Sequence, residues 1–209
     1  MGNSLGQFYA GLSYSRGNGV DQSDLKAFEW YLKSSSQGNA SAMFNIGHSF
    51  ENGEIKGKCI LDAIPWYEKA ILEGHPYAES RLGRILRDGD GIEKDLDRAF
   101  KLLSLAASKN RADAQCCLAE MILDDSFGNV PTGLYWLRRS VKYKDEKAPK
   151  LLLKWEKWIA KQCAFCGKKQ DLKLCKKCKS VYYCNKECQV SHWKSSHKFE
   201  CMNEIKEAD

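Results

Sequence analysis

With 209 residues, 43% of them apolar and 29% charged, the chain has the composition of a globular protein, and an intrinsically disordered chain is excluded. No stretch approaches the ~18 consecutive apolar residues of a transmembrane helix, and the N-terminus lacks the basic and apolar segments of a secretory signal. We therefore expect an intracellular protein, cytoplasmic or nuclear, with no membrane partner. The net charge of the chain is +6; residues 163–201 carry all of it, and the charges of the other residues sum to zero.

An internal repeat of 36 residues extends over most of residues 1–160. Ala27, Ala63 and Ala99 are each followed, three residues later, by a pair of bulky residues. The bulky pairs are Trp30-Tyr31, Trp66-Tyr67 and Leu102-Leu103, with Trp136-Leu137 in a fourth copy that is shorter by two residues. Small residues recur with the same period at Gly11, Gly47 and Gly83 and at Ala42, Ala78 and Ala114. Three series with one period indicate a repeat protein.

Each repeat is predicted to form two helices. Small residues along the first helix allow a neighbouring helix to approach closely, and the Gly-containing loop after it, such as RGNGV, suits a left-handed helix end. The second helix has apolar residues at i, i+3, i+4 and i+7 and is expected to follow an Asp or Ser. The sequence predicts second helices over residues 24–35, 61–71 and 95–107. A further helix over 148–162 is expected to cover the last repeat with Leu151, Leu152, Trp155 and Ile159.

These repeats resemble the Sel-one-like repeats (SLR), which are relatives of the tetratricopeptide repeat with a slightly longer unit. The motifs that carry the resemblance are A-x3-LG at Ala78–Gly83, G-x-G-V at Gly17–Val20 and A-x2-WY-x-KA at Ala63–Ala70, and it extends over about residues 5–145. The resemblance implies a mainly α protein in which residues 1–160 form an α-solenoid of about four repeats and a capping helix. Its concave side would hold partner proteins.

The other aromatic, histidine and cysteine residues of the repeats are interpreted as structural. The aromatic pairs recur because every repeat needs the same core anchor. His48 and His75 have no ligand-type partner nearby in the pattern and are expected to be surface or hydrogen-bonded residues. Cys59, Cys116 and Cys117 lie in helical patterns and are expected to be small buried apolar residues.

Residues 161–209 form a second, cysteine-rich module. Seven of the ten cysteines lie in it, and without an export signal such clustered thiols indicate metal binding instead of disulfides. The eight ligand-type residues form four pairs: Cys163 and Cys166, Cys175 and Cys178, Cys184 and Cys188, and His197 and Cys201. Cys-x2-Cys turns direct two thiolates at one ion, and i, i+4 pairs share a helix face. Four pairs supply two closed tetrahedral zinc sites, and the metal supplies folding energy that so short a segment lacks.

The last zinc ligand has two candidates, His192 and His197. Only His197 lies four residues before Cys201 and can share a helix face with it, so His197 is assigned as the ligand. Because all four pairs are complete, no coordination position stays open for water, and both zinc ions are predicted to be structural. The chain also has no P-loop, G-x-S-x-G or H-E-x-x-H motif, and we expect it not to be an enzyme. A strand ending near Cys184, followed by short helical turns, completes the predicted module.

The lysines of the module raise nucleic-acid binding as an alternative. Residues 163–201 hold nine lysines and three acidic residues, which give this segment a net charge of +6. Seven thiolates and two divalent ions would lower the charge to about +3. The segment also has no arginine, the residue that reads base edges best. A solvated lysine surface is therefore favoured, and a nucleic-acid-associated regulatory factor remains the alternative function.

The module resembles the MYND finger at all eight ligand positions, at Tyr183 before the fifth cysteine, and at the Cys188-Gln189 and His192-Trp193 steps. Spacing alone leaves three ways to combine four pairs into two sites. The resemblance implies the interleaved, cross-brace combination in a small α+β finger. One ion would then bind Cys163, Cys166, Cys184 and Cys188, and the other would bind Cys175, Cys178, His197 and Cys201.

The same resemblance implies a peptide-binding function. MYND fingers bind short proline-rich peptides, which add beside the strand of the finger, in a groove that corresponds here to Gln189 and Trp193. Lys176 stands where a small hydroxyl residue is common after the third cysteine, and this lysine would favour acidic residues near the proline motif. The sequence thus predicts a zinc-binding adaptor protein, with one partner on the finger and a second protein on the solenoid. It leaves the oligomeric state open.

Overall fold

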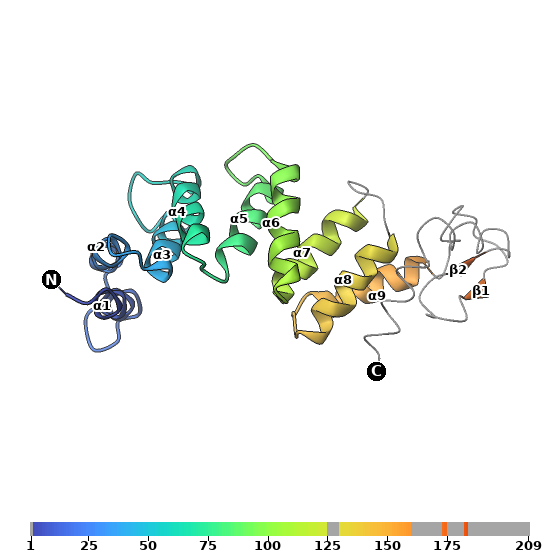
Figure 1. Ribbon diagram of the computed structural model, residues 1–209, viewed down its shortest axis with the longest axis horizontal. Helices are drawn as coiled ribbons and strands as arrows, with labels where there is room; N and C mark the ends of the chain where they lie inside the picture. Colours follow the sequence, from blue (N-terminus) through green and yellow to red (C-terminus); the bar gives the residue numbers. More distant parts are fainter. Residues whose placement is uncertain (1, 125–129, 160–172, 175–181, 184–209) are drawn as a thin grey trace. The chain divides into compact units, whose positions relative to one another are not determined.

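The computed structural model describes residues 2–124, 130–159, 173–174 and 182–183. Nine helices and two short strands lie in these ranges. The helices are α1 (Ser4–Arg16), α2 (Asp24–Ser35), α3 (Ala40–Glu51), α4 (Ile60–Leu72), α5 (Ala78–Asp88), α6 (Leu96–Ser108), α7 (Ala112–Leu123), α8 (Val130–Lys142) and α9 (Ala148–Ile159), and the strands are β1 (Lys173–Leu174) and β2 (Tyr182–Tyr183) (Figure 1). None of the helices in the described ranges combines the length and the hydropathy that a membrane span needs.

Two compact units make up the chain, Met1–Ala106 and Ala107–Asp209. In the first unit, α1 packs against α2 and α3 against α4, so each repeat is a helix pair, and α2–α3 and α4–α5 contacts join successive repeats. In the second unit, α7 packs against α8 and α8 against α9. The predicted two-helix repeat is confirmed, and α2 occupies the predicted residues 24–35. The predicted domain boundary between residues 160 and 161 stays a prediction.

The two helices of a repeat approach closely because the first helix carries a glycine where the second carries its bulky anchor. A Cβ atom added to Gly11 would lie 2.5 Å from Cε1 of Tyr31, which is far closer than two unbonded carbon atoms tolerate. The equivalent separations are 3.0 Å from Gly47 to Cε1 of Tyr67 and 2.8 Å from Gly83 to Cγ of Leu103. The glycine series is therefore a requirement of helix packing, as the sequence predicts.

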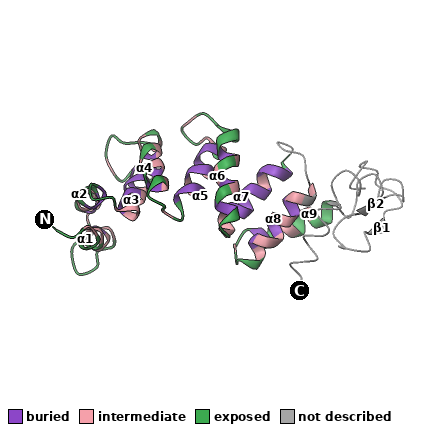
Figure 2. Cartoon of the chain, viewed as in Figure 1, coloured by how far each residue is buried: buried purple, intermediate pink, exposed green. Residues whose placement is uncertain are grey.

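The second residue of each bulky pair is the core anchor. These buried anchors are Tyr31, Tyr67, Leu103 and Leu137. Figure 2 shows that buried segments lie on the helices, whereas the long loops between them are mostly exposed. The tryptophans that precede the two tyrosines are only half-buried, and a lysine from the next helical turn lies over each ring. Lys33 Nζ is 4.4 Å from the ring centroid of Trp30, and Lys69 Nζ is 4.3 Å from that of Trp66. The predicted core role thus holds for the second member of each pair, whereas the first covers the edge of the core.

The second helices start 36 residues apart, and the residue before each of them differs. Ser23 and Asp95 each accept a hydrogen bond from a backbone N–H of the following turn, at 3.3 and 2.9 Å. Cys59 stands at the same position before α4, and the Asp62 carboxylate accepts a hydrogen bond from the Cys59 N–H at 3.0 Å. The expectations that Cys59 is buried and that an Asp or Ser precedes this helix are therefore wrong. Cys59 is exposed because the cap position lies outside the apolar stripe of the helix.

The fourth repeat keeps a hydrogen bond found in the first. Ser34 Oγ donates to the carbonyl oxygen of Ser4 at 2.7 Å, and Ser140 Oγ donates to the carbonyl oxygen of Ala112 at 2.8 Å. Ala112 lies three periods beyond Ser4, whereas Ser140 lies two residues short of three periods beyond Ser34. The predicted shortening of the fourth copy is confirmed, and it falls between these two positions.

Helix α9 packs over the fourth repeat, as predicted. Leu151, Leu152 and Trp155 contact a buried cluster. The members of this cluster are Cys116, Ala119, Leu123, Leu137 and Ala148. The side chain of Ile159, which the sequence places on the same face, lies outside the described residues.

Replacing Gly11 by Ala is expected to lower the free energy of unfolding by about 1–3 kcal/mol, because the new methyl group would collide with Tyr31. Gly6→Ala is the matched control in the same helix, since nothing lies within 4 Å of the added Cβ. Reduced freedom of the unfolded chain should make Gly6→Ala more stable by about 0.4–1 kcal/mol. Chemical denaturation followed by circular dichroism measures both. Equal effects of the two substitutions would contradict the packing role of Gly11.

Candidate partner-binding sites

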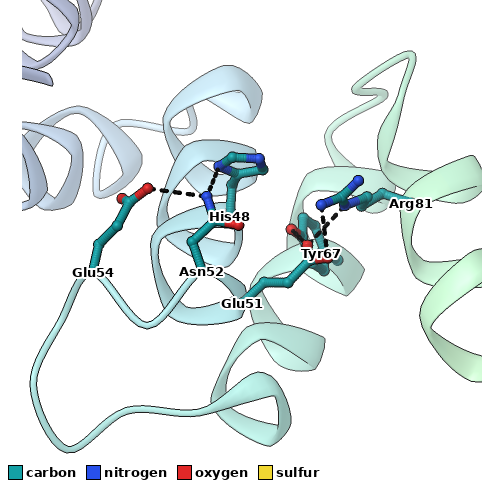
Figure 3. Close-up of polar contacts among 6 residues, drawn as sticks. All are labelled: His48, Glu51, Asn52, Glu54, Tyr67 and Arg81. Atoms are coloured by element: carbon teal, nitrogen blue, oxygen red, sulfur yellow. Dashed lines mark hydrogen bonds and ion pairs between the residues drawn. The ribbon is translucent and has the colours of Figure 1, made fainter. Parts of the chain in front are cut away.

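A polar cluster joins α3, α4 and α5 (Figure 3). Glu51, the last residue of α3, accepts a hydrogen bond from Tyr67 Oη at 2.6 Å. The guanidinium of Arg81 binds both oxygens of the same carboxylate, with Nε and Nη2 each 2.7 Å from one oxygen. This two-pronged contact is the strong geometry for arginine and carboxylate. It links the second repeat to the third.

Burial and charge pairing define the electrostatics of this cluster. Tyr67 is fully buried, and the side chains of Glu51 and Arg81 are 16% and 24% exposed. Burial, and then the adjacent Glu51 carboxylate, raise the pKa of Tyr67, so its hydroxyl remains a donor. Burial alone would lower the pKa of Arg81, but its bonds to Glu51 outweigh burial and the pKa is raised. All charges of the cluster are paired, so its role is to hold helices together.

The first repeat contains a neutral counterpart of this cluster. Tyr31 occupies the position of Tyr67; burial raises the pKa of Tyr31, and the nearby side chains of Asn45 and Ser15 oppose that effect. Ser15 and Asn45 stand 36 positions before Glu51 and Arg81. One period after Glu51, Tyr67 and Arg81, the same three positions are occupied by Arg87, Leu103 and Cys117. One set of positions therefore carries neutral, charged or largely apolar residues in successive repeats.

Both histidines of the second repeat pack against Phe44. The amide of Asn52 lies 3.0 Å from His48 Nδ1 and donates to Glu54 Oε1 at 3.0 Å (Figure 3). The ring of His75 stacks on that of Phe44 with centroids 4.3 Å apart, and the ring of His48 stacks on it at 6.4 Å. His48 contacts Asn52, in line with the expected hydrogen-bonded role, and neither histidine belongs to a group of ligand-type side chains in the described ranges.

Two of the three cysteines outside the cysteine-rich module are buried, as predicted. They are Cys116 and Cys117. Burial, followed by the nearby Asp145 and Glu120 carboxylates, raises the pKa of the Cys116 thiol far above its usual value. This thiol stays protonated and is therefore a poor nucleophile and metal ligand. In the described ranges, no group of three His, Cys, Asp or Glu side chains is arranged to hold a metal ion.

The predicted zinc ligands and peptide-binding residues lie outside the described residues. They are Cys163, Cys166, Cys175, Cys178, Cys184, Cys188, His197, Cys201, Lys176, Gln189 and Trp193. The structure describes a two-stranded antiparallel ladder within this module, with Lys173 opposite Tyr183 and Leu174 opposite Tyr182. The predicted strand that ends near the fifth cysteine is confirmed, because β2 stops at the residue before it.

Helix pairs repeated every 36 residues, followed by a short ladder in a cysteine-rich segment, define a helical repeat protein with a C-terminal finger. The Sel1 repeat family matches residues 4–39, 40–75 and 76–110, which together make up half of the chain, and the MYND finger family matches residues 163–201. The chain belongs to the Sel1 repeat family and carries a MYND finger. The finger match begins at the first predicted ligand and ends at the last.

Two solved structures share the fold of the repeats. A protective antigen of uropathogenic Escherichia coli that displays an SLR fold superposes with a TM-score of 0.68, at 25% identity over 72% of this chain and 32% of the antigen. A Sel1 repeat protein from Oxalobacter formigenes gives a TM-score of 0.66, at 27% identity over 76% of this chain and 64% of that protein. The predicted α-solenoid class is confirmed.

Curated relatives match over a much shorter stretch. Ubiquitin carboxyl-terminal hydrolase 19 of Arabidopsis thaliana is 52% identical over 40 residues, which are 19% of this chain and 6% of the hydrolase. Hydrolase 17 of the same plant is 52% identical over 29 residues, or 14% of this chain and 4% of that enzyme. The chain therefore spans only a small fraction of the length of these relatives. The Sel1 repeats and the MYND finger support a role in protein–protein interaction, and the finger makes the chain a zinc-binding protein.

Sequence analysis missed the charged cluster of Glu51, Tyr67 and Arg81. A signal for the cluster exists in the 36-residue alignment, because Ser15 and Asn45, which stand one period before Glu51 and Arg81, are polar as well. Charged residues on amphipathic helices normally form the solvated face, so they did not stand out. The pairing becomes visible only when successive repeats are packed together.

Replacing Glu51 by Gln is expected to lower the free energy of unfolding by about 1–3 kcal/mol, because Arg81 would stay half-buried without its counter-charge. Glu68→Gln is the matched control, since Glu68 pairs with Arg98 and both side chains are 43% exposed. The control should change stability by no more than about 0.5 kcal/mol. Urea denaturation compares the two variants. Similar losses would mean that the Glu51 cluster contributes no more than a surface ion pair.

Proposed function

We propose that this chain is a zinc-dependent adaptor, in which the finger binds a partner peptide, including proline-rich peptides, and the Sel1 repeats bind a second protein. The observation that carries the proposal is the presence of two protein-interaction modules in one chain. The charge-paired cluster between the second and third repeats supports it, because it makes that part of the repeats a firm surface on which a partner can dock.

Two structural zinc ions are part of the proposal. Seven thiols and one imidazole are a donor set that suits tetrahedral zinc. Cys175 is the next residue after β1 and Cys184 is the next after β2, and antiparallel strands lead out of a ladder at opposite ends. This arrangement supports the assignment of Cys175 and Cys184 to different ions and disfavours a shared one. We assign one ion to Cys163, Cys166, Cys184 and Cys188, and the other to Cys175, Cys178, His197 and Cys201.

The peptide would add as a strand beside the finger's ladder. In the described residues the ladder has two strands, so each strand has an outer edge whose backbone groups are suited to pairing with an added chain. Gln189 and Trp193 would supply the groove, and Lys176 would select acidic residues near the proline motif. The expected partner is therefore an extended peptide with a proline-rich core and a flanking acidic residue.

The proposed adaptor is intracellular and has no enzymatic activity. The hydrolase relatives share with it a segment that amounts to 6% or less of their own length, so their named activity gives no support for catalysis by this chain. A zinc site filled by four protein ligands lacks the open position that catalysis by zinc requires.

Native mass spectrometry of the reduced chain is expected to find two zinc ions per molecule. Cys175→Ala should lose zinc and unfold the finger, whereas the helical circular dichroism signal of the repeats should persist, because the described ranges contain no group of side chains that could hold a metal ion. Cys59→Ser is the matched control, because this exposed thiol lies outside the finger. A folded chain with one zinc ion, or none, would contradict the assignment of eight ligands.

Trp193→Ala is expected to weaken binding of the chain to an array of proline-rich peptides at least ~30-fold, equivalent to about 2 kcal/mol, without release of zinc. Trp158→Ala is the control, since Trp158 in α9 is 46% exposed and lies outside the finger. Retained peptide binding by Trp193→Ala would place the groove elsewhere. Salt-dependent binding to a random DNA duplex, with no binding to any peptide, would favour a nucleic-acid-associated factor instead.

A further inference from the structure

A small polar hollow lies in the first unit, between the second and third repeats. Its lining includes Glu51, Ile60, Arg81, Arg84, Asp88 and Asp90. Its volume is about 80 Å³, well below the ~300–1,000 Å³ of sites that take a whole small molecule. The hollow therefore suits a single side-chain head group.

Most of the charges around the hollow are already paired. Arg81 binds both oxygens of Glu51, and Asp88 accepts a hydrogen bond from Arg87 Nε at 2.7 Å. Arg84 and Asp90 are the exceptions, since neither forms a hydrogen bond or ion pair with another residue in the described ranges; Arg84 is half-buried, whereas Asp90 is exposed. A half-buried guanidinium carries five N–H donors that need acceptors. Of these two unpaired charges, the positive one is the more buried and therefore has the greater need of a counter-charge.

The second repeat shows how the same positions behave when they satisfy one another. The residues 36 positions before Arg84, Asp88 and Asp90 are His48, Asn52 and Glu54. The amide of Asn52 bridges its two neighbours there, with both contacts at 3.0 Å (Figure 3). In the third repeat Asp88 pairs with Arg87 instead, and no bridge forms. In the second repeat these residues therefore bond to one another, whereas in the third repeat the guanidinium of Arg84 has no partner among the described residues and lies beside the hollow.

We propose that this hollow binds the carboxylate of one acidic side chain, Asp or Glu, of a partner polypeptide, with Arg84 as its main ligand. The planar guanidinium presents two parallel N–H donors that match a carboxylate, and Ile60 offers an apolar wall to the methylene groups of the acid. Asp90 is exposed at the rim and would repel a second negative charge, which selects a single acidic residue over a run of them. The inference rests on the proposed adaptor function and names the chemistry that the repeats recognise.

The test uses the full ¹⁵N-labelled chain and two small probes, N-acetyl-glutamic acid α-amide and its neutral analogue N-acetyl-glutamine amide. The acid is expected to shift the Nε–Hε NMR signal of Arg84 saturably, and the analogue should bind at least ~10-fold more weakly. Arg87 and Arg98 serve as internal references, because each is already paired with a carboxylate. Their signals should move much less than that of Arg84.

Substitution of the ligand gives a second, independent readout. Arg84→Gln should abolish the saturable response to the acid while leaving the melting temperature unchanged, because Arg84 bonds to no other described residue. Arg81→Gln is the contrasting variant and should lower the melting temperature, since it leaves Glu51 without its partner. A melting temperature that falls equally in both variants would assign Arg84 a structural role and overturn the proposal.

Several outcomes of the titration would also overturn it. Equal shifts with the acid and with the amide, or equal shifts at all three arginines, would mean that no carboxylate site exists here. N-acetylglycine carries a free main-chain carboxylate, and tighter binding of this probe would assign the hollow to a chain terminus instead of a side chain. None of these probes binds through the finger. Failure of peptide binding at the finger would therefore refute the adaptor function but not the carboxylate site at Arg84. Failure of the carboxylate titration would refute that site but not peptide binding by the finger.

Discussion

The first three repeats depend on one steric constraint. Their two helices pack so closely that the first helix carries a glycine, which has no Cβ, where it meets the bulky anchor of the second helix. The glycine and its anchor are separated by the same number of residues in the first three repeats. In the shortened fourth repeat, Ala119 and Leu137 occupy these positions in the buried cluster. A change of loop length is thus accompanied by a change in the contact itself.

Around this constant contact, the polar positions next to the anchor vary freely. They form a neutral group around Tyr31 and a charged group around Tyr67. The steric fit supplies the fold, so the polar set is free to serve recognition. Arg84 illustrates this division, because the helix that carries it is packed by Leu82 and Gly83 while its guanidinium is left for another partner.

Periodicity was sufficient to predict the helix pairs and the glycine contacts, because both follow from spacing along one chain segment; the local sequence also predicted the strand that ends before Cys184. It was not sufficient for Cys59, since a helical pattern does not reveal which residue will be the cap. It also missed the pairing of Glu51 with Arg81, which are 30 residues apart in sequence and meet only through the packing of two repeats. The zinc ligands were predicted from spacing and stay a prediction, whereas the shape of a peptide groove depends on how the finger packs.

The Glu51–Arg81 pair makes neighbouring repeats non-interchangeable. Its carboxylate belongs to the second repeat and its guanidinium to the third, so duplication or exchange of either one alone would strand a half-buried charge. The neutral group around Tyr31 imposes no such penalty, because hydroxyls and amides tolerate many partners. Repeat families grow by copying single units, but here recombination that keeps the second and third repeats together is the path that preserves the fold.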